Sequence, residues 1–294
     1  MERIRTALVP EDIEIREGIA SLPHSNLHYI ETGAGPPLII VPATMSEVQD
    51  WAGLAAFMGQ RFRAFFFELP GHGKSPPLDA RYSSKRMAQV IADFMDYLGF
   101  FRANLMGFSF GGILTLAALG RLSHRIDRVI LISPVLDSAA LRISPFGKLF
   151  ARVLIRTGQG VWLQAMIHRS VQSDAGSAFW AQVAARIGNV EHPDIVKENL
   201  RATPLCTVQT LARQLDEILN THHFVGSVWY TQPCYFVMSV IDPLVDFSLT
   251  STALKRIFPN IDETRLSLPY HRPRELPTFE YLNYTYPHLL DRMS

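Results

Sequence analysis

One serine near the middle of the chain stands among small residues, in the order Gly107-Phe108-Ser109-Phe110-Gly111-Gly112. A serine displayed on a sharp turn from a strand into a helix needs tiny residues two positions to either side, because strand and helix approach closely there. Gly107 and Gly111 meet that need. A helix after the serine would also direct free N–H groups toward it, which favours developing negative charge. The motif therefore predicts a nucleophile at Ser109.

The segments around this motif predict the elements that would position it. Short apolar runs bounded by turn residues alternate with stretches of helical periodicity, which is typical of a mostly parallel sheet flanked by helices, an α/β fold. Strands are predicted at residues 26–31, 38–41, 64–69, 103–106, 128–133, 234–240 and 265–268. Helices are predicted at 84–98, 110–120 and 248–257, where apolar residues recur three and four positions apart.

The alternation stops between Pro134 and Phe224, where helical patterns dominate. Ser144-Pro145 is typical of a helix start, and the apolar residues that follow lie on one helical face up to Gly158. A second helical pattern covers residues 207–219. A loop of this length without structure would be unusual. We therefore expect a helical cap at 138–224, inserted after the sixth core strand, with 1–137 and 225–294 forming the core.

With the motif around Ser109, the chain resembles the α/β-hydrolase superfamily, especially its capped esterase and carbon–carbon hydrolase branch. The turn Glu68-Leu69-Pro70-Gly71-His72-Gly73-Lys74-Ser75 is similar to the turn after that family's fourth strand. The resemblance covers residues 26–292. In the family this turn is structural, so His72 is expected to be a turn residue.

The resemblance also implies the partners of the nucleophile, since a serine needs a histidine to take its proton and a carboxylate to fix that histidine's tautomer. The family's chain order of serine, acid and histidine implies Asp242 as the acid and His271 as the base. His288 stays open as another base, and Asp246 and Asp137 as other acids.

Acyl transfer needs N–H donors for an oxyanion, and one should be the backbone of Phe110, directly after the nucleophile. The resemblance places the other in the turn after residues 38–41, where Pro42-Ala43-Thr44 replaces the family's usual His-Gly and Thr44 matches the donor position. Trp51 lies downstream as in relatives. Alternatively, Thr44 only shapes the turn.

The substrate pocket is expected to involve Phe108, Trp162, Met166 and Tyr270. Aromatic and basic side chains recur in the expected cap. The aromatic residues are expected to form the cap's core or, alternatively, to line the pocket. The basic residues form a solvated face or attract an anionic substrate. The aromatic and methionine residues are Phe146, Phe150, Trp162, Met166, Phe179 and Trp180; the basic ones are Lys148, Arg152, Arg156, His168 and Arg169.

Composition bounds the class of protein. The net charge is +1 with acids and bases mixed along the chain, which argues against a nucleic-acid partner. We expect no membrane span, no leader and a cytoplasmic protein, either a monomer or a homodimer. Cys206 and Cys234 make no disulfide framework. His222-His223 lacks metal-ligand spacing, so neither a metal nor a cofactor is expected.

These features lead to one main hypothesis, the hydrolysis of a small to medium, largely apolar carboxylic ester or lactone by Ser109. A meta-cleavage-type carbon–carbon hydrolase, a cofactor-free peroxidase and an acyltransferase are alternatives. A non-catalytic ligand receptor would be expected to lack one of the three residues. Haloalkane dehalogenation and epoxide hydrolysis are disfavoured, because their displacement chemistry uses an aspartate at the position of Ser109.

Overall fold

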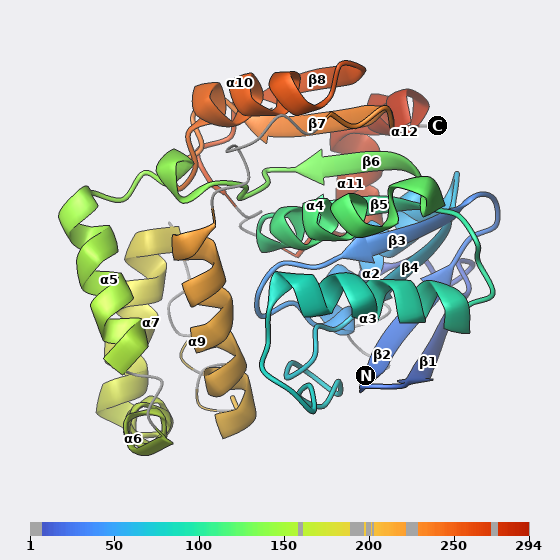
Figure 1. Ribbon diagram of the computed structural model, residues 1–294. Coiled ribbons are helices and arrows are strands. Elements are labelled where there is room, and N and C mark those ends of the chain that lie inside the picture. Colours follow the sequence, from blue (N-terminus) through green and yellow to red (C-terminus); the bar gives the residue numbers. More distant parts are fainter. Residues whose placement is uncertain are drawn as a thin grey trace.

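A computed structural model describes residues 8–157, 161–188, 197, 201, 203–221, 229–271 and 276–293. It contains an eight-stranded sheet in the order β1-β2-β4-β3-β5-β6-β7-β8 (Figure 1). The strands from β4 to β8 run parallel to one another, while β1 and β2 add an antiparallel edge. The bounds are β1 Ile15–Leu22, β2 Ser25–Thr32, β3 Pro37–Val41, β4 Arg63–Phe67, β5 Ala103–Phe108, β6 Ile126–Ile132, β7 Cys234–Ser239 and β8 Ile261–Leu266.

Helices cover both faces of the sheet because its central strands are apolar on both sides. In β4, Phe65 and Phe67 face one apolar cluster and Phe66 faces the other. The first cluster includes side chains of α3 Ser84–Tyr97, α4 Phe110–Leu122 and α10 Phe247–Ile257. The second includes side chains of α2 Val48–Gly59, α11 Phe279–Thr285 and α12 Pro287–Met293. The predicted fold class, a mostly parallel sheet flanked by helices, is confirmed.

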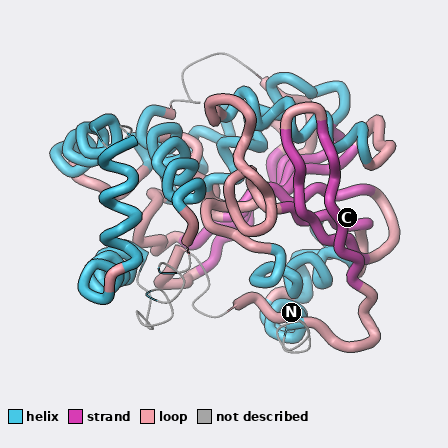
Figure 2. Tube along the Cα trace, turned by 90° about the horizontal axis from the view of Figure 1, so that it is seen from below, coloured by secondary structure: helices cyan, strands magenta, loops and turns pink. Residues whose placement is uncertain are grey.

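The segment between β6 and β7 is helical in its described residues, which contain no strand; we call residues 138–224 the insert. Its helices gather on one side of the molecule, at the left in both general views (Figures 1 and 2). α9 contacts α4, α5 and α6, so it lies between the core and the rest of the insert. The bounds are α5 Pro145–Thr157, α6 Val161–Gln172, α7 Asp174–Gly188 and α9 Leu205–Asn220.

The expectation that the aromatic residues of α5 and α7 form the core of the cap is wrong for Phe146, Phe150 and Phe179. Phe146 and Phe150 are 78% and 62% exposed, and Phe179 of α7 is also exposed. The side of α5 that packs against the core carries Ala151 and Ile155 instead, about half a turn away around the helix. In the described residues, no helix combines the length and the apolar character that crossing a bilayer requires.

Candidate active site

Ser109 occupies a strained turn between β5 and α4. Its backbone has φ 51° and ψ −115°, a conformation that L-residues rarely adopt. A methyl group on Gly111 would lie 2.2 Å from the carbonyl oxygen of Val41, and one on Gly107 would lie 2.6 Å from that of Gly111. Only glycine fits at either position, so the end of β3 and the start of α4 come together at Ser109.

Backbone hydrogen bonds hold this turn in place. The N–H of Ser109 donates to the carbonyl of Ile132 at 3.1 Å. The Ser109 carbonyl accepts from the N–H groups of Gly112 and Val135, each at 2.9 Å. These bonds attach the backbone of the nucleophile turn to β6 and to the segment after it. They do not involve the Ser109 side chain.

The structure brings Ser109, His271 and Asp242 together in one line. Ser109 Oγ lies 2.8 Å from His271 Nε2, and His271 Nδ1 lies 2.8 Å from Asp242 Oδ2. An ionised carboxylate can only accept, so Nδ1 carries the imidazole proton and Nε2 accepts from the Ser109 hydroxyl. This is the geometry in which a histidine can take the proton of a serine.

Asp242 is fully buried in the loop just after β7, and its carboxylate accepts several hydrogen bonds there. Oδ1 accepts from the N–H groups of Leu244 and Val245 at 2.8 and 2.9 Å. Burial acts to raise the pKa of the Asp242 carboxyl, but the hydrogen bond and charge of His271 and these two N–H groups outweigh it, so the pKa is lowered. Asp242 therefore stays ionised and holds the imidazole in one orientation.

Ser239 fastens the loop that carries His271, a role that the sequence did not reveal. Its hydroxyl donates to the carbonyl of Leu268 at 2.7 Å and accepts from the Leu268 N–H at 2.9 Å. β8 ends at Leu266, so these bonds continue the pairing of β7 and β8 toward the histidine.

Phe108 lies beside the imidazole and is buried. The centroids of the Phe108 and His271 rings are 6.1 Å apart, with an angle of 28° between the ring planes. The Trp51 ring packs against Phe108 with a centroid distance of 5.1 Å. Phe108 thus contacts the base directly, whereas a pocket-lining residue would face open space. Its expected place in the substrate pocket remains a prediction.

The two expected oxyanion donors lie at the same edge. Phe110 begins α4, so its N–H has no acceptor within the helix. Thr44 is half-buried in the turn after β3, and Met45 next to it has φ 55°. Because β3 pairs with β5 and Val41 touches Gly111, this turn and the start of α4 are neighbours.

The alternative acids and bases lie elsewhere. His72 is buried, and its Nε2 donates to Gln214 Oε1 of α9 at 3.1 Å. His288 is exposed on α12. Asp246 caps α10 by accepting from Leu249 N–H, and Asp137 accepts from Ala139 N–H in the same manner. His222 and His223 lie outside the described residues, within which no three His, Cys, Asp or Glu side chains are grouped to hold a metal.

The remaining pocket candidates are scattered. Met166 is 61% exposed on α6, and the side chain of Trp162 lies outside the described residues. The Tyr270 hydroxyl lies 3.5 Å from that of Tyr281 on α11. Tyr270 directly precedes His271 in the chain, whereas Met166 is an exposed residue of the insert.

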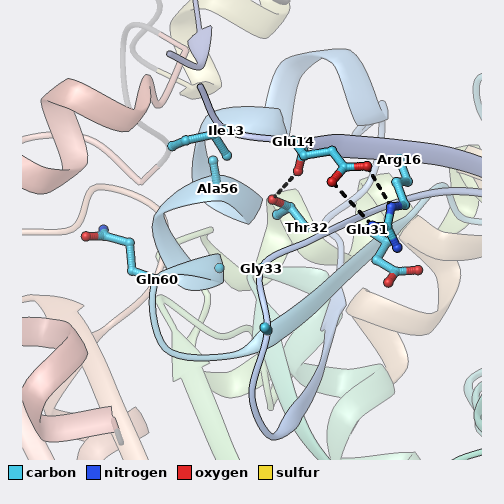
Figure 3. Close-up of a pocket in the computed structure, with 10 residues that line it drawn as sticks. Ile13, Glu14, Arg16, Glu31, Thr32, Gly33, Ala56 and Gln60 are labelled. Carbon is cyan, nitrogen blue, oxygen red and sulfur yellow. Dashed lines mark hydrogen bonds and ion pairs between the residues drawn. The ribbon is translucent and has the colours of Figure 1, made fainter. Parts of the chain in front are cut away.

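A cavity of about 440 Å³ lies far from Ser109 (Figure 3). It is lined by residues at the start of β1, at the end of β2 with the turn after it, and at the end of α2, among them Glu14, Gly33 and Gln60. Gly33 precedes β3, whereas Ser109 follows the parallel strand β5. The two residues therefore lie at opposite ends of these strands. At the wall of this cavity, Arg16 donates to the Glu14 carboxylate at 2.9 Å.

Comparisons with known proteins agree with the fold. A family model described as "alpha/beta hydrolase fold" matches residues 36–182. Haloalkane dehalogenase 2 of Mycobacterium bovis is 26% identical over 207 residues, 66% of this chain and 71% of that protein. The 2-hydroxy-6-oxo-2,4-heptadienoate hydrolase of Pseudomonas putida is 31% identical over 115 residues, 38% of this chain and 41% of that protein. The enol-lactonase from Burkholderia xenovorans LB400 superposes with a TM-score of 0.67 at 17% identity, covering 94% of this chain and 98% of that one.

Proposed function

Because the chain belongs to the α/β hydrolase fold family, we propose that it is a serine hydrolase that cleaves carboxylic esters or lactones through an acyl-enzyme. The observation that carries the proposal is the hydrogen-bonded line from Ser109 through His271 to Asp242, with 2.8 Å at each step. The enol-lactonase among the structural neighbours is consistent with it, as a protein of the same fold.

In the first half of the reaction, Ser109 Oγ attacks the carbonyl carbon while its proton moves to His271 Nε2. The imidazolium is stabilised by the ionised Asp242, whose carboxylate stays in place. Collapse of the tetrahedral intermediate expels the alkoxide, which takes the proton from Nε2 and leaves the acyl group on Oγ.

In the second half, water enters where the alcohol left and gives a proton to His271 Nε2 as it attacks the acyl carbon. Collapse releases the carboxylic acid and returns the proton to Ser109. In both halves negative charge develops on the former carbonyl oxygen. The N–H groups of Phe110 and Thr44 are proposed to bind that oxygen, and one such donor contributes roughly 3 kcal/mol.

The insert is proposed to act as a cap that shapes the substrate pocket. Its helix α9 is joined to the core close to the turn after β4. Thr207 Oγ1 donates to the carbonyl of Gly71 at 2.7 Å, and the Glu217 carboxylate accepts from the N–H of Ser84 at 3.0 Å. These contacts support the proposal that α9 keeps a fixed position on the core. The acyl group of the substrate would then be selected by the side chains of the cap and the core that surround it.

Carbon–carbon bond hydrolysis is the second candidate, since the same three residues serve it. The observation that favours it is the similarity to the 2-hydroxy-6-oxo-2,4-heptadienoate hydrolase, which spans 38% of this chain. Halide displacement, by contrast, needs a carboxylate nucleophile, and this chain has Ser109 at the turn.

The experiment is a stopped-flow assay with p-nitrophenyl esters of graded acyl length. A burst of p-nitrophenol followed by slower turnover is expected, because acylation precedes hydrolysis of the acyl-enzyme. Ser109→Ala should lower kcat by roughly 10⁴-fold or more. The matched control is Ser123→Ala at the exposed far end of α4, which should leave kcat unchanged. Full turnover by Ser109→Ala would overturn the proposal.

A further inference from the structure

The outer side of α5 carries a continuous exposed apolar row. Phe146, Leu149, Phe150 and Val153 recur at helical spacings of three and four, and they are 78%, 58%, 62% and 53% exposed. We call these four residues the α5 stripe. A contiguous row of large apolar side chains in water usually marks an interaction surface. Neither the core nor the proposed reaction makes use of it.

Contacts on the inner side of α5 fix the orientation of the helix, and the stripe therefore faces away from the core. Its opposite side packs against the core through Ala151 and Ile155. Arg152 donates to the carbonyl of Leu219 at 2.6 Å, near the end of α9. Lys148 donates to the carbonyl of Ser138 at 2.6 Å. In Figure 1, α5 forms the edge of the molecule farthest from the sheet, with α9 on its inner side.

A basic row borders the stripe. Lys148, Arg152 and Arg156 lie four residues apart along one flank of α5, and α5 itself has no acidic residue. Lys148 and Arg152 donate to neutral carbonyl groups and therefore keep their charge, while Arg156 is exposed. Asp174 is the acidic residue of segment 141–188, and it pairs with Arg201 at 2.7 Å. Against it the segment has the basic residues Arg142, Lys148, Arg152, Arg156, Arg169 and Arg186, although the whole chain has a net charge of only +1.

We propose that the α5 stripe docks the protein on an anionic phospholipid bilayer. A helix with an apolar row beside a basic flank is suited to lie in the plane of the membrane interface, with its apolar side chains in the acyl region and its positive charge near the phosphates. With 13 residues, α5 presents about 20 Å of such surface. The docking needs no spanning helix and does not depend on the proposed chemistry at Ser109.

Charge selects a lipid surface over a second copy of the chain. In a two-fold interface between antiparallel α5 helices the α5 stripe would meet itself, and the basic rows of the two copies would lie on the same side. Asp246, the N-cap of α10, is already opposite Arg142 at 3.4 Å, so it supplies no counter-charge to the basic row of α5. Anionic headgroups supply the missing counter-charge, whereas an identical subunit repeats the same charge.

The test is sedimentation of the full-length protein with vesicles of phosphatidylcholine alone or mixed with phosphatidylglycerol. We expect binding to the mixed vesicles, weakened by high salt because the cationic contribution is screened. Phe146→Ser combined with Phe150→Ser should weaken it by roughly 10-fold or more, since both rings leave the bilayer. Arg156→Glu should also weaken it. Phe101→Ser, at a 70% exposed ring between α3 and β5, is the matched control and should bind as the native chain does.

Each other outcome overturns the proposal. Absence of binding to the mixed vesicles excludes lipid docking, as does binding that the paired phenylalanine substitutions leave unchanged. A concentration-dependent dimer that these substitutions dissociate, without vesicle binding, would assign the stripe to a second copy instead. The substituted side chains are exposed, so an unchanged melting temperature will show that the variants are folded.

Discussion

The nucleophile turn and the insert are built in opposite ways. At Ser109 the backbone does the positioning: strands and helix touch so closely that Gly107 and Gly111 cannot carry a side chain. In the insert, side chains do the positioning, with Thr207 and Gln214 of α9 bonded to the turn after β4. The first arrangement permits one geometry, while the second can be changed one contact at a time. We therefore expect substitutions at the turn to abolish activity and substitutions in the insert to tune stability.

Asp242→Asn should have the largest effect and tests the active-site side of this contrast. Removal of the carboxylate leaves the imidazole without its orienting charge, and kcat on a p-nitrophenyl ester should fall by roughly 10⁴-fold with little loss of stability. Asp246→Asn is the matched control, because Asp246 is the N-cap of α10 and asparagine caps equally well. Equal losses in the two variants would exclude the assignment of Asp242.

Gly111→Ala should come next, as a loss of folding stability. The added methyl group would lie 2.2 Å from the Val41 carbonyl, so β3 or α4 must shift, at about 3 kcal/mol or more. Gly120→Ala, farther along α4, meets only the Tyr230 hydroxyl at 3.3 Å and gains helix propensity. Urea unfolding of both variants checks the difference; similar midpoints would show that the turn is not crowded.

The pH dependence of stability reports on the contact between core and insert. Burial lowers the pKa of His72 to about 4, although the hydrogen bond to Gln214 opposes the shift. In the unfolded chain the pKa is about 6.5, so between those values the unfolded state binds more protons and stability falls as the pH is lowered. The loss should reach about 3 kcal/mol at pH 4.

His72→Asn removes the titrating ring and should flatten this slope in urea titrations between pH 7 and 4. His288→Asn, at an exposed site on α12, should keep the native slope. A native slope in His72→Asn would place the titrating group elsewhere.

The smallest effects are expected from two substitutions that each remove hydrogen bonds of one hydroxyl group. One should lower kcat through the position of His271, and the other should lower stability through the contact between α9 and the core. Ser239→Ala removes both bonds to Leu268, so kcat should fall by roughly 10-fold because the His271 loop loosens. Thr207→Val removes one bond to Gly71, so unfolding should cost about 1 kcal/mol less while kcat stays near native. The reverse pattern would contradict the contrast between the two regions.

The sequence was most informative where backbone crowding dictates residue type. The glycines around Ser109 identified the turn, and alternating apolar runs placed most strands within a few residues. β1 and α2 were not predicted, and the strand expected at 265–268 is β8 at Ile261–Leu266. β1 is an edge strand with an exposed face, so it lacks the apolar run of a central strand.

Periodicity identified α5 and its apolar face but did not reveal that this face is exposed. An apolar row on a helix indicates contact with another apolar surface, but it does not indicate whether that surface belongs to the same chain. Similarly, a serine at position 239 has no sequence pattern that reveals its two bonds to Leu268, because the partner is brought near only by the pairing of β7 and β8. Contacts between distant segments of this kind depend on tertiary structure.

The most direct test of the central claim is to trap the acyl group. The native chain is mixed with a p-nitrophenyl ester, quenched in acid within the burst phase, and examined by intact and peptide mass spectrometry. The account predicts a mass increase equal to one acyl group, carried by the peptide that contains Ser109 and absent from Ser109→Ala. Turnover with no acyl adduct, or an adduct on another residue, would contradict it.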